Sequence, residues 1–294
     1  MDCGKNDVSH LFNGGGIMRR VLVGIAVLSF ASICFVCQAV ENLLGELQQL
    51  KIRSEKMGKD VPVTIILPDK YKESKTKYPS LYLLHGASNN QNTWLDRTGI
   101  RQLASQYNVI VVCPDAGRTS WYFDSSEDPK YQYETFISTE LVTYIDVKYR
   151  TKKDRSQRAI AGCSMGGHGA MFLAIRHKDT FGLASAMSGG VDIRPFSENW
   201  DIKKRLGDIK EHADRWEALT VINLIDLLKD GELAISIDCG VNDFFLDVNR
   251  ALHKKLVENK INHDYTERFG GHGWDYWKNS IKYQMLFFSE QFSK

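Results

Sequence analysis

One stretch of the chain, residues 159–170, constrains the fold more than any other. It reads Ala-Ile-Ala-Gly-Cys-Ser-Met-Gly-Gly-His-Gly-Ala, so an apolar run ends in Gly-x-Ser-x-Gly and helix-forming residues follow. This pattern predicts a tight strand-to-helix turn with Ser164 at its apex. Glycine is expected at 162 and 166 because side chains there would collide with the approaching strand and helix. The hydroxyl would stand at a helix N-terminus, whose partial positive charge favours a nearby oxyanion.

The runs around this turn predict a doubly wound α/β architecture with a mostly parallel sheet. Residues 80–84 and 109–113 are continuously apolar, which is typical of strands covered by helices on both faces. Residues 50–54 and 61–67 predict an antiparallel pair at the sheet edge, where Pro62 fits best. Further strands are expected at 183–187, 234–239 and 265–269, and helices at 133–149, 244–259 and 276–292.

The N-terminal residues predict an export signal. A basic pair follows Met18, an apolar run covers 21–36, and Ala39 ends a cleavage-type sequence. We therefore expect translation to begin at Met18 and cleavage to leave a secreted or periplasmic protein. The apolar run is shorter than the roughly 20 residues of a membrane span, so no stable span is expected. A lipoprotein is disfavoured because large aliphatic residues precede Cys34 and Cys37.

Residues 40–294 are predicted to form one domain. Residues 191–230 contain charged helical segments and no strand candidate. They are expected either to cap the serine as a helical insert or to pack as outer helices, and both alternatives stay open. The apolar surroundings of Cys113, Cys163 and Cys239 predict buried thiols without a disulfide framework. A net charge of +2, with no basic run longer than 203–205, excludes an electrostatic footprint for nucleic acid.

A serine hydroxyl attacks an ester at neutral pH only when a base takes its proton and a carboxylate orients that base. In this topology both partners are expected in loops after later strands, the acid before the histidine. Asp243 meets this condition, because Gly240 ends a predicted strand and the carboxylate opens the next helix. Asp243 is also placed to cap that helix, an alternative that stays open. Asp238 lies within the strand and is predicted to be structural.

His272 is the candidate base, since it lies in a glycine loop between the last predicted strand and the last helix. His168 is too close to the serine in sequence to turn back toward it, so we expect a buried hydrogen-bonding group. His85 precedes the serine at a strand end and is assigned to shaping a turn. Four further histidines are expected at the surface: His177, His212, His253 and His263.

Two backbone N–H groups must receive the oxyanion that appears as the nucleophile adds. Met165, directly after the serine, is expected to supply one. Ala87, in the turn after His85 and Gly86, is expected to supply the other.

Taken together, these motifs resemble the esterase D family of α/β-hydrolases. The family includes tributyrin-type esterases, S-formylglutathione hydrolase, feruloyl and acetyl esterases, and mycolyl transferases. The resemblance extends over residues 50–292 and rests on five motifs, at 84–86, 120–122, 162–167, 238–243 and 271–274. It implies an α/β-hydrolase fold with Ser164 as nucleophile, Asp243 as acid and His272 as base. It also places the oxyanion donors on Met165 and Ala87, although many relatives carry leucine at the second position.

Within this family the export signal disfavours a cytosolic thioesterase, and no acyl groove for mycolyl transfer is identifiable. Aromatic residues Trp121, Tyr122 and Trp274, with Trp94, are expected either to stack on a sugar or aryl acid or to belong to the core. The preferred substrates are acetyl or feruloyl esters on plant polysaccharide. A short-chain carboxylesterase of the tributyrin type and an acyltransferase are the alternatives.

The sequence thus predicts an exported serine esterase that forms an acyl-enzyme on Ser164 and uses neither metal nor organic cofactor. A carbohydrate-binding protein without catalysis is disfavoured, because all three triad candidates are present. A peptidase is disfavoured because no additional propeller domain is recognisable. The expected partner is a small-molecule or polysaccharide-linked ester, and the sequence carries no prediction of oligomeric state.

Overall fold

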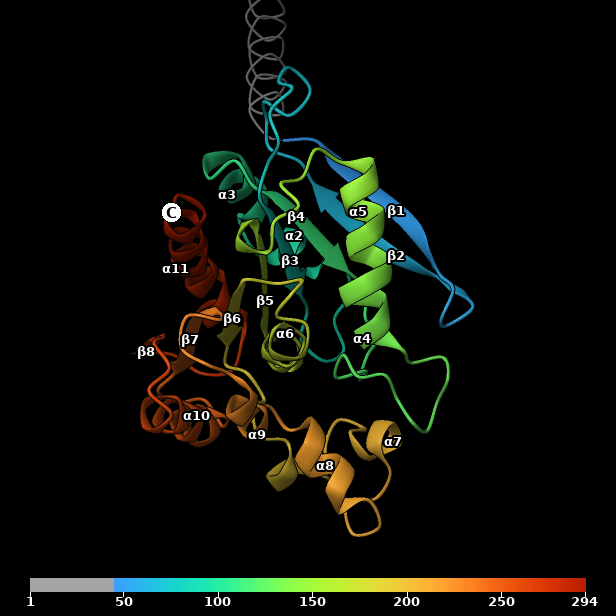
Figure 1. The fold of residues 1–294 in the computed structure, drawn as a ribbon, viewed down its shortest axis with the longest axis vertical. Coiled ribbons are helices and arrows are strands. Elements are labelled where there is room, and N and C mark those ends of the chain that lie inside the picture. Colours follow the sequence, from blue (N-terminus) through green and yellow to red (C-terminus); the bar gives the residue numbers. More distant parts are fainter. Residues whose placement is uncertain (1–44) are drawn as a thin grey trace, which may run out of the picture. The chain divides into compact units, whose positions relative to one another are not determined.

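An eight-stranded sheet organises residues 45–294, the part of the chain that the computed structural model describes. The strands lie in the order β1-β2-β4-β3-β5-β6-β7-β8 (Figure 1). Their bounds are Leu47–Ser54 (β1), Lys59–Ile66 (β2), Ser80–Leu84 (β3), Ile110–Pro114 (β4), Arg158–Cys163 (β5), Leu183–Met187 (β6), Ala234–Gly240 (β7) and Asp264–Arg268 (β8). The signal peptide predicted at 1–39, with its start at Met18, lies outside the described residues.

The sheet is parallel from β4 through β8 and antiparallel only where β2 meets β1 and β4. Strands β3, β4, β5 and β6 are buried along their whole length. Their continuous apolar sequences arise because helices cover both faces of the sheet. The predicted doubly wound α/β architecture is confirmed.

The predicted hairpin, β1 and β2, forms at one side of the sheet, but of these two strands only β1 lies at the edge. β2, which contains Pro62, lies between β1 and β4, so the expectation of an edge strand for this proline is wrong. Pro62 has no N–H to donate, and it is tolerated because it lies just outside the residues of β2 that pair with β4, which are 63–66. The carbonyl of Pro62 accepts a hydrogen bond from the Asp115 N–H, at 2.8 Å.

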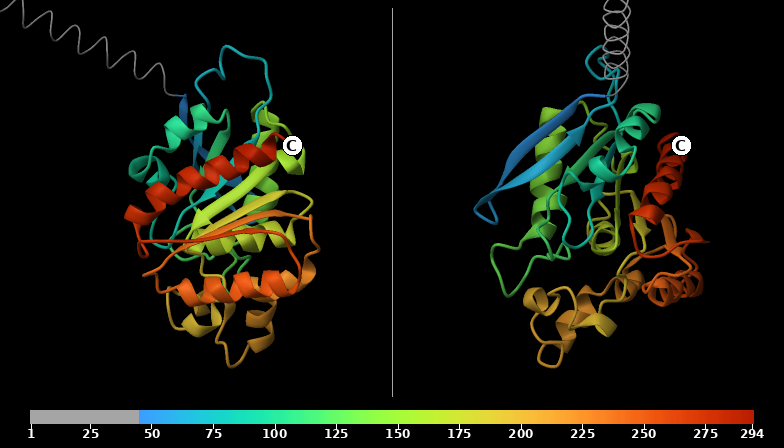
Figure 2. Two further views of the ribbon diagram at one scale, coloured as in Figure 1. Left: turned by 90° about the vertical axis from the view of Figure 1, so that its left-hand side faces the viewer. Right: turned by 180° about the vertical axis from the view of Figure 1, so that it is seen from behind.

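Helices cover the sheet in two layers (Figure 2). On one face, α3 and α11 bury apolar side chains such as Ile100 and Ile281 against the strands. On the other face α5, α6 and α10 do the same, with Ile145, Phe172 and Leu252. The helix bounds are Thr93–Arg97 (α2), Ile100–Gln106 (α3), Tyr133–Thr135 (α4), Val142–Lys148 (α5), Met165–Arg176 (α6), Lys203–Leu206 (α7), Ala213–Leu219 (α8), Val221–Leu224 (α9), Leu246–Glu258 (α10) and Trp274–Phe292 (α11).

The helix predicted at 133–149 is interrupted by a π-helical segment, η1 (Phe136–Leu141), between α4 and α5. The insert at 191–230 contains the short helices α7, α8 and α9 and no strand. Trp216 on α8 is fully buried, so part of this insert packs into the core. Within residues 45–294, no helix has the length and apolar character needed to cross a membrane. Cys113, Cys163 and Cys239 are buried free thiols, as predicted.

Candidate active site

Ser164 occupies the turn between β5 and α6 in a strained backbone conformation, with φ 55° and ψ −120°. A positive φ is uncommon for a residue with a side chain and is typical of functional turns. The neighbouring glycines make the turn possible, because the chain passes very close to them. A Cβ on Gly162 would lie 2.4 Å from the Gly166 carbonyl oxygen, and one on Gly166 would lie 2.4 Å from the Leu84 carbonyl oxygen. The predicted need for glycine at both positions is confirmed.

Ser164, His272 and Asp243 form one hydrogen-bonded chain. The Nε2 atom of His272 lies 2.9 Å from Ser164 Oγ, and its Nδ1 atom lies 2.9 and 3.0 Å from the two carboxylate oxygens of Asp243. Because a carboxylate only accepts hydrogen bonds, Nδ1 carries a proton and its N–H donates a hydrogen bond to Asp243. In the neutral imidazole, Nε2 is then an acceptor for the serine hydroxyl. This arrangement can remove the serine proton as Oγ attacks an electrophile.

The sheet places these three residues together. Ser164 directly follows β5, Asp243 lies in the turn between β7 and α10, and His272 lies in the loop between β8 and α11. The carboxyl ends of parallel strands meet at one edge of the sheet, so the loops after β5, β7 and β8 adjoin. The side chain of Asp243 has no exposed surface, whereas that of His272 is 15% exposed. The acid is therefore shielded from water while the base remains accessible.

Asp243 also supports its own turn. Its Oδ1 accepts a hydrogen bond of 2.8 Å from the backbone N–H of Phe245, just before α10 begins. Asp243 therefore both supports the start of α10, the alternative considered from the sequence, and contacts His272. Asp238, in contrast, is buried inside β7 and accepts hydrogen bonds from Arg268, Ser280 and Gln284. Burial raises the pKa of its carboxyl, and its structural role is as predicted.

The two expected oxyanion donors belong to residues that adjoin Ser164. Met165 is the first residue of α6, where N–H groups have no acceptor within the helix. Ala87 follows Gly86, and a Cβ built on Gly86 would lie 3.4 Å from Ser164 Cβ, so this turn adjoins the serine. Among residues 45–294, neither N–H donates to another protein group. Both can therefore donate to an oxygen that develops negative charge beside Ser164 Oγ.

His85 holds the Ala87 turn in place. Its Nδ1 donates to the Gly86 carbonyl at 2.8 Å, and its Nε2 accepts from the Ala116 N–H at 2.9 Å. The hydroxyl of Tyr122 donates to the His85 carbonyl at 2.9 Å. The buried imidazole thus ties the turn after β3 to the turn after β4, in agreement with the turn-shaping role predicted for it.

Three of the four aromatic residues considered for the substrate site belong to the core. Trp121 is 1% exposed, and Trp94 and Tyr122 are fully buried, so none of these rings has a face for a sugar or aryl acid to stack on. The stacking role considered for these three is wrong, and the core alternative holds. Trp121 instead donates its indole N–H to the Trp200 carbonyl. Trp274 is partly exposed and lines an open cavity of about 500 Å³ together with His272.

Phe244 is a candidate site residue that the sequence reasoning missed. Its ring centroid lies 4.1 Å from that of His272, yet the residue is 52% exposed. Trp200 stacks on Phe244 with an interplanar angle of 20° and 5.8 Å between ring centroids. The sequence feature that could have identified it is its position directly after the candidate acid, Asp243. Because Trp200 belongs to residues 191–230, the insert reaches the aromatic neighbour of His272; its role as a cap stays a prediction.

The other histidines lie away from this chain of hydrogen bonds. His168 is fully buried on α6 between Phe123 and Phe172, and burial lowers its pKa to about 3. Within the described part of the chain, neither ring nitrogen has a hydrogen-bond partner of normal geometry, so only the burial predicted for it is confirmed. His177 contacts Glu134, and His253 contacts His263.

Comparisons with known proteins agree with this geometry. The Esterase family model matches residues 54–288. The chain is 36% identical to an esterase of Mycobacterium tuberculosis over 147 residues, covering 49% of this chain and 32% of that protein. It is 27% identical to the acetyl esterase of Caldicellulosiruptor saccharolyticus over 255 residues, covering 80% and 95%. The chain therefore spans about a third of the first relative and nearly all of the second.

The solved structure of a ferulic acid esterase is also similar. It superimposes with a TM-score of 0.74 at 28% identity, and the match covers 85% of this chain and 99% of that one.

Proposed function

The chain belongs to the Esterase family and has the α/β-hydrolase fold, and from that premise we propose that it is a serine esterase acting on carboxylic esters. One observation carries the proposal: His272 lies 2.9 Å from both Ser164 Oγ and an oxygen of Asp243. This geometry supports general-base activation of a serine that stands in a strained turn.

In the proposed reaction, His272 Nε2 takes the hydroxyl proton of Ser164 as Oγ attacks the ester carbonyl. The oxyanion of the tetrahedral intermediate accepts hydrogen bonds from the N–H groups of Met165 and Ala87. The intermediate collapses when the C–O bond to the alcohol breaks and His272 returns the proton to the departing oxygen. Water, deprotonated by the same imidazole, then attacks the acyl carbonyl. The bond from that carbon to Ser164 Oγ breaks, His272 returns the proton to Oγ, and the acid is released. Asp243 keeps the imidazole in its productive tautomer throughout.

The proposed substrates are acetyl or feruloyl esters on polysaccharide. The similarity to an acetyl esterase over 95% of its length and to a ferulic acid esterase supports this class. Phe244 and Trp200 present stacked rings beside His272, and Trp274 lines the cavity at the same loop. Rings of this kind suit a planar aryl acid or the apolar face of a sugar.

We also propose that the protein is exported. The support is the basic, apolar and small-residue succession within residues 1–39. A polysaccharide ester would be met outside the cytoplasm, so the location and the proposed substrate are mutually consistent.

A release assay tests this proposal. Purified protein is incubated with acetylated xylan, feruloylated xylan and tributyrin, with the Ser164→Ala variant as a blank. Release of acetate or ferulate that exceeds cleavage of tributyrin is the expected outcome. Cleavage of tributyrin alone would instead support a short-chain carboxylesterase. Transfer of the acyl group to an added alcohol in preference to water would support an acyltransferase.

A further inference from the structure

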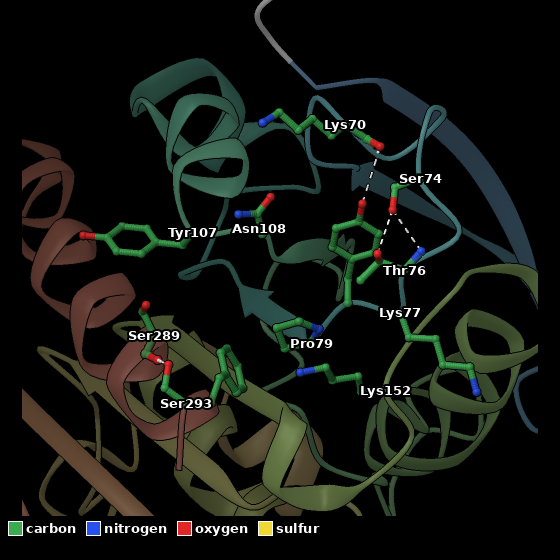
Figure 3. A pocket seen from close by; sticks show the side chains of 12 residues that line it. Lys70, Ser74, Thr76, Lys77, Pro79, Tyr107, Asn108, Lys152, Ser289 and Ser293 are labelled. Carbon is green, nitrogen blue, oxygen red and sulfur yellow. Dashed lines mark hydrogen bonds between the residues drawn. The ribbon is translucent and has the colours of Figure 1, made fainter.

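Figure 3 shows a second pocket. It lies at the opposite end of the sheet from Ser164. It is lined by Tyr78 and Pro79, which directly precede β3, whereas Ser164 follows the far end of the parallel strand β5. A five-residue strand is about 17 Å long, so the two sites are well separated. The cavity volume is about 430 Å³, within the range of roughly 300–1,000 Å³ common for small-molecule sites.

Three lysines line this pocket and no carboxylate does. They are Lys70, Lys77 and Lys152, and among residues 45–294 none of them is in an ion pair. Lys152 points into the pocket toward Pro79, Lys70 extends along its upper side, and Lys77 is directed away (Figure 3). The ammonium of Lys152 donates to the amide oxygen of Gln157, at 3.1 Å. An anion beside Lys152 would meet a positive charge that forms no ion pair with any other group of residues 45–294.

The positive charge comes from two segments that are far apart in sequence. Residues 70–77 carry four lysines, and residues 148–153 carry three lysines and an arginine. Tyr78 joins them, since its N–H donates to the Arg150 carbonyl and its carbonyl accepts from the Lys152 N–H, each at 2.8 Å. With a net charge of only +2 on the whole chain, this concentration of charge is local.

The remaining lining suits a carbohydrate. The hydroxyl-bearing residues Ser74, Thr76 and Ser289 also line the cavity, together with the rings of Tyr107 and Phe292. Such a mixture of hydroxyls and rings can bind sugar hydroxyls and the apolar face of a sugar.

The end of α11 limits the charge of the ligand. Ser289 and Phe292 belong to its last turn, and the C-terminus of a helix carries a partial negative charge. A doubly charged phosphate is therefore less suitable here than a singly charged carboxylate.

We propose that this pocket binds the uronic acid side groups of an acidic polysaccharide, with Lys152 receiving the carboxylate and Lys70 adding positive charge along the upper side of the pocket. The inference rests on the polysaccharide-ester function proposed above and adds a second binding site to it. The pocket would hold the polymer at one end of the sheet while Ser164 acts on esters at the other.

Calorimetry with two matched sugars tests the binding itself. The probes are xylotetraose and the same oligosaccharide carrying one glucuronic acid, neither of which contains an ester. We expect the acidic sugar to bind at least about tenfold more tightly, a difference of about 1.4 kcal/mol. The double variant Lys70→Gln/Lys152→Gln should bind both sugars equally. The control Lys229→Gln/Lys254→Gln, which removes two exposed lysines outside the pocket, should keep the preference.

Equal binding of the two sugars by the natural protein, or an unchanged preference in the double variant, would overturn the proposal. Tighter binding of inorganic phosphate than of the acidic sugar would overturn it as well. Turnover of 4-nitrophenyl acetate is measured in parallel and should be unchanged in the double variant. Because binding is measured without any ester, loss of the uronate preference is distinguishable from failure of the esterase proposal.

Discussion

The imidazole Nε2 of His272 lies 2.9 Å from the hydroxyl oxygen of Ser164, although 108 positions separate the two residues in the chain. Each follows a parallel strand of the same sheet, β5 for the serine and β8 for the histidine. Asp243, after the intervening strand β7, holds the other ring nitrogen. The proposed chemistry depends on this short contact, and the following predictions test it and its surroundings.

Ser164→Ala and His272→Ala should each lower kcat/KM for 4-nitrophenyl acetate at least about ten-thousand-fold, because either change removes proton transfer to or from the nucleophile. Thermal unfolding should remain cooperative in both variants. The partly exposed His212 supplies a control, and His212→Ala should keep normal turnover. Undiminished activity in the serine or histidine variant would refute the mechanism.

Asp243→Asn and Asp238→Asn should separate catalysis from stability. Asp243→Asn is expected to lower kcat by about ten-thousand-fold, since the amide no longer selects the productive tautomer of His272. Asp238→Asn should keep kcat but lower the free energy of unfolding by about 3 kcal/mol, because Arg268 loses its buried carboxylate partner. Urea unfolding and steady-state kinetics on both proteins check this. A similar fall in kcat for both would show that Asp243 has no special role.

Gly166→Ala should disrupt the turn that holds Ser164. The added Cβ would lie 2.4 Å from the Leu84 carbonyl oxygen, so β3 and α6 must move apart. We expect a loss of about 1–3 kcal/mol in the free energy of unfolding and of about a hundredfold in kcat/KM. At Gly99 a Cβ would meet only the end of the flexible Gln102 side chain, at 3.4 Å, so Gly99→Ala is the control and should be nearly neutral. Equal effects at both positions would contradict the steric argument.

Phe244→Ala should change substrate preference more than basal turnover. Phe244 is 52% exposed beside His272, so its ring can contact a planar acyl group. Loss of one aromatic contact, worth about 0.5–1.5 kcal/mol, should lower kcat/KM for methyl ferulate by up to about tenfold. The value for 4-nitrophenyl acetate should change less. Leu286 on α11, which is 48% exposed and lies outside this cavity, provides the control Leu286→Ala. Equal losses on the two esters in the Phe244 variant would argue against a contact between this ring and the acyl group.

His168 should make the protein less stable as the pH falls. Burial lowers its pKa from 6.5 to about 3, so below pH 6.5 the unfolded chain takes up a proton that the folded protein does not. The free energy of unfolding therefore falls progressively between pH 6.5 and about 3, by about 1.4 kcal/mol per pH unit.

The variant His168→Leu isolates this effect, because it keeps an apolar group between Phe123 and Phe172. Urea unfolding at pH 7 and pH 5 should give a stability difference about 2 kcal/mol smaller than in the natural protein. An unchanged difference would mean that another group causes the loss.

Local patterns in the sequence determined the fold class and the candidate residues Ser164, Asp243 and His272. The elbow is a local feature, since Gly162 and Gly166 are needed wherever a strand turns this tightly into a helix. The acid and base were found because the ends of parallel strands converge, so a loop's place in the strand order indicates its place in space.

Only the tertiary structure decided which aromatic residues are accessible and where charge gathers. Trp121 and Phe244 are both aromatic residues in segments that follow strands, β4 and β7, yet one is buried and the other lies exposed beside His272. The lysine-rich segments 70–77 and 148–153 look unremarkable when read separately. They adjoin through hydrogen bonds of Tyr71 and Tyr78 with residues of the second segment. The physical reason is that exposure and local charge depend on which distant segments pack around a residue, and periodicity along a single segment does not encode this.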